Sequence, residues 1–185
     1  YLIIIDANFP SGARRVIEDA KKVSSKPIKY VFDTHHHGDH AYGNPVWTKM
    51  GATTLAHIGV VNEMKAREPQ RWQEAAKGRK DVADLKLATA EPPQKTFDKS
   101  FKLQDGTRTV EFLHFGWAHT KGDGFAWLAK EKIICTGDAV VNVQGDTEPY
   151  ALVTVDNGAG RIYAERANDL GYFSLLGVEL PFSPP

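Results

Sequence analysis

Residues Tyr30 to Asn44 read YVFDTHHHGDHAYGN and place four histidines and one aspartate within the six positions from His35 to His40. The segment Ile28 to Thr34 (IKYVFDT), which overlaps its start, is rich in β-branched and aromatic residues and predicts a strand. Side chains that bind metals therefore follow directly on a strand. Two interpretations arise: a metal site, or a solvated polar loop that happens to be rich in histidine.

The sequence before this loop predicts a strand, a helix and then the strand that leads into the histidines. Leu2 to Asp6 (LIIID) has the character of a short buried strand, and Asn8 to Val23 turns into a helix with Ser11 as its expected N-cap. Pro27 ends the helical region. This order is a βαβ unit, which implies parallel strands with the helix on one face. Open α/β sheets bind ligands at the carboxyl ends of their strands, where this loop lies.

The sequence after the loop changes from alternating strands and helices to hairpins. A short helix before Gly51 and a strand at Ala52 to His57 are followed by mixed charges from Val61 to Lys86, interpreted mainly as a solvated helical face. A binding patch, or a lid over the site, is the alternative for that segment. Glu91 to Phe97 (EPPQKTF) is interpreted as a proline-marked connection. Hairpins are then predicted at residues 99–115, around Asp105-Gly106, and at residues 124–138.

Length and composition limit the classes of protein. The 185 residues allow one substantial core, so one domain over residues 1–185 is expected. Basic and acidic residues balance at 23 each and no apolar run is long enough to span a bilayer, so neither nucleic acid nor a membrane is an expected partner. The single cysteine, Cys135, excludes an intrachain disulfide and a thiolate-rich zinc site. The compartment stays open between cytoplasm and periplasm.

The spacing of the histidine loop suits metal chemistry. His35 and His37 are two apart in an extended segment, so their rings are expected on the same side, where they could hold one ion. Asp39 and His40 follow at the turn into a helix and offer ligands at a neighbouring position. Imidazole with carboxylate suits zinc, iron or manganese, with zinc the default, and two ions about 3.5–4 Å apart could share a bridging hydroxide.

Two distant stretches add further ligand types. HFGWAHTKGD places His119 in a loop between two predicted strands, and ICTGDAV places Asp138 directly after an apolar strand. Taken singly, His119 could be a hydrogen-bonded loop histidine and Asp138 a turn residue. Together with the first loop they form a ligand set.

These motifs resemble the metallo-β-lactamase superfamily. HHHGDH (His35 to His40) is similar to its HxHxDH signature, GWAHTKGD (Gly116 to Asp123) to its second histidine loop, and TGD (Thr136 to Asp138) to its Gly-Asp after a strand. The segments THHHGDHAYGN and GATTLAH are similar to sequences of the SoxH-type and glyoxalase II-like branch. The resemblance covers Leu2 to Asn142. Residues 143–185 carry no recognised motif, although Glu165 to Pro185 is compatible with a helix and a strand.

The resemblance implies an αββα sandwich and a role for each matching residue. His35, His37 and His119 would hold the first metal, and Asp39, His40 and Asp138 the second, with Asp138 bridging both. Asp6 would support the ligands from behind, and His114, which shares the His119 loop, is the other supporting candidate. The family also has earlier strands and a final ligand histidine, whereas no histidine follows His119 here. One or two zinc ions are therefore expected, with iron or manganese as alternatives.

The resemblance implies three functions to be distinguished. The first is a zinc-dependent hydrolase in which a metal-bound hydroxide attacks a small-molecule ester, thioester, lactone or amide, a β-lactam included, with Asp39 or a metal-held water handling the proton. The second is a mononuclear iron enzyme of the persulfide dioxygenase kind. The third is a metal-binding member without turnover. Because missing outer strands would expose sheet edges, a homodimer or larger homo-oligomer is expected.

Overall fold

The computed structural model describes residues 1–140, 152–156 and 162–166 of the chain. The chain divides into two compact units, Tyr1–Val140 and Val141–Pro185. In the second unit, β9 (Leu152–Asp156) and β10 (Ile162–Arg166) form an antiparallel pair. Beyond Arg166, the helix and strand expected toward Pro185 lie outside the described residues. The expectations of one domain and of a homodimer stay predictions.

The first sheet carries the histidine loop and is entirely parallel. Its strands follow the order β1 (Leu2–Ile5), β2 (Ile28–Asp33), β3 (Thr53–His57) and β4 (Lys95–Phe97). The predicted βαβ unit is confirmed, with α1 (Pro10–Val23) connecting β1 to β2. The interpretation of Glu91–Phe97 as a connection alone was wrong, because its last three residues pair with β3 as an edge strand.

The expected cap of α1 was also wrong. The helix begins at Pro10 with Phe9 as its N-cap, so Ser11 lies inside the first turn. Proline at the first helical position needs no hydrogen-bond acceptor, because it lacks the N–H that would otherwise be orphaned. The carboxylate of Asp81 accepts the Ser11 N–H at 3.0 Å instead. A side chain from a distant helix thus does part of the capping that the local sequence was expected to do.

The second sheet is antiparallel and follows the predicted hairpins. It contains β5 (Ser100–Gln104), β6 (Thr109–Leu113), β7 (Phe125–Leu128) and β8 (Ile133–Cys135) in sequence order. Its strands are short, and each one pairs with the next along the chain. The loop between β6 and β7 carries His119, and the chain after β8 carries Asp138.

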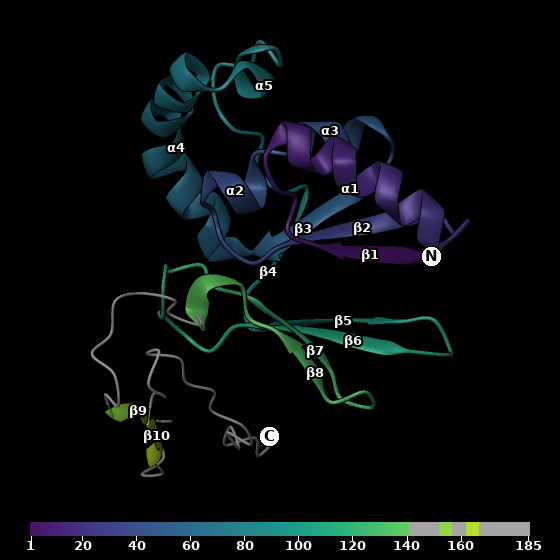
Figure 1. The fold of residues 1–185 in the computed structure, drawn as a ribbon, viewed down its shortest axis with the longest axis vertical. Helices are drawn as coiled ribbons and strands as arrows, with labels where there is room; N and C mark the ends of the chain where they lie inside the picture. The colour runs from purple at the N-terminus through teal and green to yellow at the C-terminus, as the bar shows by residue number, and fades with distance from the viewer. Residues whose placement is uncertain (141–151, 157–161, 167–185) are drawn as a thin grey trace. The chain divides into compact units, whose positions relative to one another are not determined.

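The two sheets pack face to face, and helices cover the other face of the parallel sheet (Figure 1). Successive residues of β2 point to opposite sides, as strand geometry requires. Phe32 packs between the sheets against Phe112, with ring centroids 4.5 Å apart. Its neighbour Val31 packs with Trp47 of α3 (Asn44–Lys49) and Ala13 of α1. The expected α/β sandwich is confirmed. The part of the chain that the structure describes contains no helical layer on the outer face of β5–β8.

The mixed-charge segment after β3 is a long helix with one buried face. The helix α4 (Ile58–Gly78) is followed by the short α5 (Lys80–Ala83). Val60, Met64, Glu68 and Trp72 recur every four residues along α4 and are all buried, so the solvated face is only part of the helix. Among the described helices, none combines the length and apolar character that crossing a membrane requires.

Candidate metal centre

The end of β1 fixes the histidine loop at the carboxyl end of β2. The backbone N–H of Thr34 donates to Oδ1 of Asp6 at 2.8 Å, and the backbone N–H of Asp6 donates to the carbonyl of Phe32 at 2.7 Å. The helix α2 (Gly38–Ala41) begins within the loop, with His37 as its N-cap. At Gly38 a Cβ would lie 2.8 Å from the ring of Tyr42. The glycine is therefore needed for close packing at the point where strand becomes helix.

Asp138 reaches the same place from the second sheet. It lies in a single 3₁₀ turn, Gly137–Ala139, directly after β8. Gly137 has a φ of +52°, and a Cβ there would clash with the side chain of Thr34. A glycine suits both the left-handed backbone and the close approach. The Gly-Asp pair after the strand thus brings a carboxylate to the histidine loop.

The His119 loop is held in shape by one buried carboxylate, that of Asp123. Its Oδ2 accepts the backbone N–H groups of Ala118, His119 and Thr120 at 3.1, 2.7 and 2.8 Å. Its Oδ1 accepts the Thr120 hydroxyl at 2.6 Å. Asp123 is 2% exposed, so these bonds satisfy a charge that water cannot reach. No role for Asp123 was predicted, although the quoted GWAHTKGD motif contains it.

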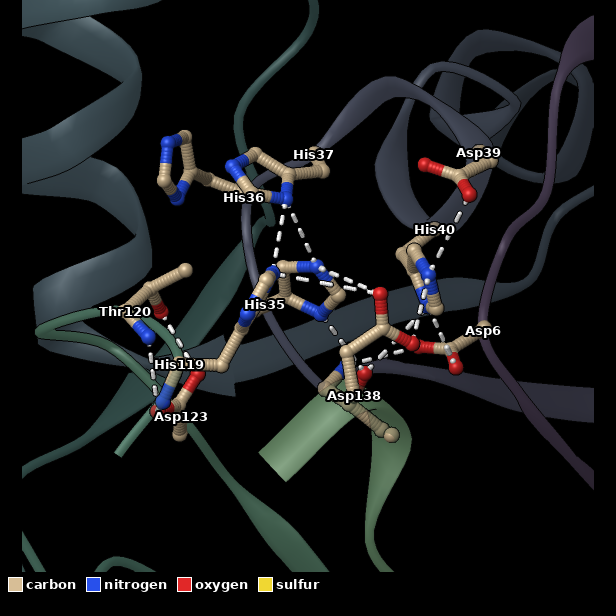
Figure 2. Close-up of polar contacts among 12 residues, drawn as sticks. Asp6, His35, His36, His37, Asp39, His40, His119, Thr120, Asp123 and Asp138 are labelled. Carbon is tan, nitrogen blue, oxygen red and sulfur yellow. Dashed lines mark hydrogen bonds and ion pairs between the residues drawn. The ribbon is translucent and has the colours of Figure 1, made fainter. Parts of the chain in front are cut away.

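Three imidazoles meet at one point. Nε2 of His35 and Nε2 of His119 each lie 3.1 Å from Nδ1 of His37 (Figure 2). A ring nitrogen carries either one proton or one lone pair, so Nδ1 of His37 cannot form a good hydrogen bond to each of its two neighbours at the same time. Three imidazole nitrogens directed at one point are instead the donor set that a zinc-like cation takes. The three histidines predicted for the first metal thus fit a metal ion.

A second group lies beside the first and shares His35 with it. His35, His40 and Asp138 place one ligand atom each within 4.8 Å of one another. Nε2 of His40 lies 3.3 Å from Oδ1 of Asp138, whose Oδ2 lies 3.8 Å from Nε2 of His35 and 3.9 Å from Nε2 of His119. The Asp138 carboxylate therefore stands between the two groups, the position that a bridging ligand requires.

Asp39 is the predicted ligand that the structure brings into neither group. Its side chain is 61% exposed, and its closest ionic contact is Nε2 of His40 at 3.5 Å. In Figure 2 it lies beyond His40, away from the point where the three imidazoles meet. Its assignments as a ligand of the second metal and as a proton carrier stay predictions.

The comparison with known families agrees with this geometry. A family model described as the metallo-beta-lactamase superfamily matches residues 1–170. This chain belongs to that superfamily. The match extends past Asn142, the last residue over which the sequence motifs were recognised, and includes both strands described in the second unit.

Solved structures of metallo-beta-lactamases share the fold at low sequence identity. One from Pontibacter korlensis is 19% identical with a TM-score of 0.58, over 77% of this chain and 57% of that one. The DIM-1 enzyme exposed to ceftazidime is 20% identical with a TM-score of 0.58, over 78% and 56%. The BLEG-1 B3 enzyme is 21% identical with a TM-score of 0.54, over 75% and 62%. This chain thus spans about three fifths of the length of these structures, and the likeness shows the fold alone.

In this metallo-beta-lactamase superfamily member, Asp6 lies behind the second ligand group. Its Oδ2 is 2.9 Å from Nδ1 of His40, which directs the opposite ring nitrogen, Nε2, at Asp138. Burial acts to lower the pKa of His40, but the hydrogen bond to Asp6 and the negative charges of Asp6, Asp39 and Asp138 together outweigh burial, so the net shift is upward. A carboxylate behind a ligand histidine fixes both its tautomer and its orientation. The supporting role that the resemblance implied for Asp6 is compatible with this contact and stays a prediction.

His114, the other predicted supporting residue, belongs to neither ligand group. Nδ1 lies 2.7 Å from the carbonyl of Asp123, and its ring stacks on that of His57 at 3.6 Å between centroids. His57 in turn accepts the Gly59 N–H at the start of α4. His114 thus contacts the backbone of the residue that shapes the His119 loop, and its supporting role stays a prediction.

Burial keeps two members of the first ligand group, His35 and His37, in the form that binds metal. It lowers the pKa of His35 to about 2, and the neighbouring histidines act in the same direction. The pKa of His37 is also lowered, by burial first and by His119 next. A neutral imidazole offers its lone pair to a cation, whereas an imidazolium does not. Both histidines are therefore neutral ligands at neutral pH.

Behind the loop lies a buried polar network that sequence reasoning missed. His36 was expected to point away from the ligands, and it belongs to neither metal group. Its Nε2 lies 3.3 Å from the guanidinium of Arg71 and 3.8 Å from the carboxylate of Glu68. The Tyr42 hydroxyl donates to that same carboxylate. The only available signal was a glutamate on the stripe of α4 that is otherwise apolar.

Proposed function

We propose that this chain is a metal-dependent hydrolase of small-molecule esters, thioesters, lactones or amides, with zinc as its metal. The convergence of the His35, His37 and His119 nitrogens beside the Asp138 carboxylate carries this proposal. Membership of the SoxH-type or glyoxalase II-like branch forms part of it. The names of the solved metallo-beta-lactamases make a β-lactam one substrate to test, but a shared fold does not fix the substrate.

The residues of the chain provide positions for a metal and for a substrate. A zinc ion, when bound, supplies Lewis acidity to the scissile carbonyl and to the attacking water. His37 and His119 also line a cavity of about 190 Å³, so a substrate in that cavity would lie next to the first ligand group. The exposed carboxylate of Asp39 is the proposed acceptor for the proton of the attacking water.

Metal content and turnover test the proposal together. Full-length protein purified without a tag or added metal is analysed for elements and assayed with an ester, a thioester, a lactone and a β-lactam. We expect one or two zinc ions per chain and turnover of at least one substrate. His119→Ala and Asp138→Ala are each expected to reduce that turnover on the order of a thousandfold, because both remove ligand atoms. Asp84→Ala, at the exposed end of α5, is the matched control.

Each contrary result indicates a different function. Wild-type activity in both ligand variants would contradict the proposed site. Iron in place of zinc, with oxygen consumed on a glutathione persulfide, would favour the oxygenase alternative. Bound metal without turnover of any substrate would favour a metal-binding member without catalysis.

A further inference from the structure

The cavity beside the first ligand group has a positively charged wall. In addition to His37 and His119, it is lined by Arg67 and Arg71 of α4 and by Lys121 and Trp117 of the His119 loop. The two arginines are one helical turn apart and so lie on the same face of α4. Ligand histidines and three cationic side chains from two separate elements thus line the same hollow.

The cations of this wall outnumber the carboxylates that neutralise them. Arg67 pairs with Glu63 at 2.6 Å, and Glu63 is the one acidic residue lining the cavity. Arg71 lies 3.6 Å from the buried Glu68 and keeps 47% of its side chain exposed. Lys121 has no carboxylate partner in the part of the chain that the structure describes. Its ammonium lies 5.2 Å from the centroid of the Trp117 ring. Positive charge is therefore in excess at the cavity.

We propose that this cavity binds an anionic group on the substrate, in the simplest case a carboxylate, and so selects anionic substrates for the reaction at the ligand histidines. This inference rests on the proposed function. Guanidinium and ammonium groups are the side chains that bind carboxylates most strongly, through charge-assisted hydrogen bonds. The volume of about 190 Å³ suits a small group, with the rest of the substrate extending outward.

Trp117 adds a preference for a flat or apolar group in the part of the substrate next to its negative charge. Its side chain is 72% exposed although it is large and apolar, and it lines the same cavity. An exposed indole face beside a cationic wall offers stacking to a flat or apolar group that carries an anion. A purely solvated helical face would explain the exposed arginines. It would not explain why Lys121 and Trp117, from another loop, border the same hollow.

A pair of esters with the same leaving group tests the selection. One is p-nitrophenyl butyrate, which is neutral, and the other is the p-nitrophenyl half-ester of glutaric acid, which carries a free carboxylate. We expect kcat/KM to be about 10- to 100-fold higher for the half-ester, the range of one charge-assisted hydrogen bond. Lys121→Gln and Arg67→Gln are each expected to lower that ratio severalfold. Lys65→Gln, an exposed charge on α4 outside the cavity, is the matched control and should keep the ratio.

A binding measurement separates failure of this inference from failure of the proposed function. Phenylacetate and its neutral analogue phenylacetamide are titrated into the same proteins by calorimetry. Tighter binding of phenylacetate that weakens in Lys121→Gln and Arg67→Gln, but not in Lys65→Gln, would support the anion site even if no ester is hydrolysed. Hydrolysis of both esters at similar kcat/KM, unchanged in those variants, would overturn the anion site and leave the hydrolase standing. Equal binding of phenylacetate by all variants would overturn it as well, since the carboxylate would then bind the metal alone.

Discussion

The two metal-ligand groups of this chain are built differently, although they lie side by side and share His35. The first group, His35, His37 and His119, consists of imidazoles whose nitrogens lie 3.1 Å apart in two contacts. The second group joins His40 and Asp138 to His35, while the further predicted ligand, Asp39, is largely exposed.

The difference lies in what holds each group. His119 stands on a loop whose backbone is bound by the buried carboxylate of Asp123, and His35 is itself buried. His40 is oriented by Asp6, but Asp39 has no comparable support among its described contacts. Ligands fixed before the metal arrives lose less conformational freedom on binding. The first group is therefore expected to bind its ion more tightly than the second.

The largest expected effect comes from removing a ligand of the first group, in contrast to removing Asp39, the predicted ligand that lies outside both groups. His37→Ala should abolish tight binding of the first ion and reduce turnover on the order of a thousandfold, because two imidazoles remain where three converged. Asp39→Ala should keep the first ion and lower the occupancy of the second. Metal per chain after dialysis, measured by elemental analysis, checks both, with Glu18→Ala on the exposed face of α1 as control. If Asp39→Ala empties the protein of all metal, the two groups are not independent and the comparison fails.

The stability of the metal-free protein should depend on pH with opposite signs through His35, which both groups share, and through His40 of the second group. The folded pKa of His35 is lowered from 6.5 to about 2, so its contribution to stability is present above pH 6.5 and is lost as the pH falls below that value. Between pH 7.5 and 5.0 this amounts to about 2 kcal/mol for one histidine. The folded pKa of His40 is raised, so its contribution is present at low pH and is lost as the pH rises through that folded value.

Chemical unfolding of the chelator-treated protein at the two pH values measures this difference. The free energy of unfolding should fall from pH 7.5 to pH 5.0 in the wild type. His35→Asn should flatten the dependence, and His40→Asn should steepen it. The same slope in both variants would show that the two histidines do not differ in environment as the structure indicates.

The sequence predicted the parts of the site that depend on local pattern. The strand before His35, the hairpins of the second sheet and the positions of His119 and Asp138 follow from periodicity, turn residues and motif spacing. These features involve residues that are close in the sequence or form a recognised motif. Predicting them therefore required no knowledge of which distant residues come into contact.

The features that were missed depend on contacts between distant residues. The edge strand at Lys95–Phe97 forms only because β3 offers an open side for pairing. The mixed charges of α4 predicted a solvated face, yet Glu68 is buried beside Tyr42 and His36, while Arg67 faces the cavity. A charged residue at helical spacing has the same local signal whether it meets solvent, a buried partner or a substrate. Only the packing of α4 against the histidine loop distinguishes these outcomes.

The smallest expected effects come from the two aspartates that hold ligands without belonging to either group. Asp123→Asn should weaken binding of the first ion, because the carboxylate that accepts the His119 N–H loses its charge. Asp6→Asn should instead weaken binding of the second ion, because it changes the orientation of His40. Each loss is expected at about 10- to 100-fold in metal affinity, the usual range for partners of ligand residues. Competition with a chromogenic chelator measures both affinities.

Asp105→Asn is the matched control, since Asp105 accepts the Thr107 and Arg108 N–H groups in the β5–β6 turn and makes no contact with either ligand group. If Asp123→Asn and Asp6→Asn weaken the same ion to the same extent, the support of the two groups is shared, and the difference between them must come from the ligands alone.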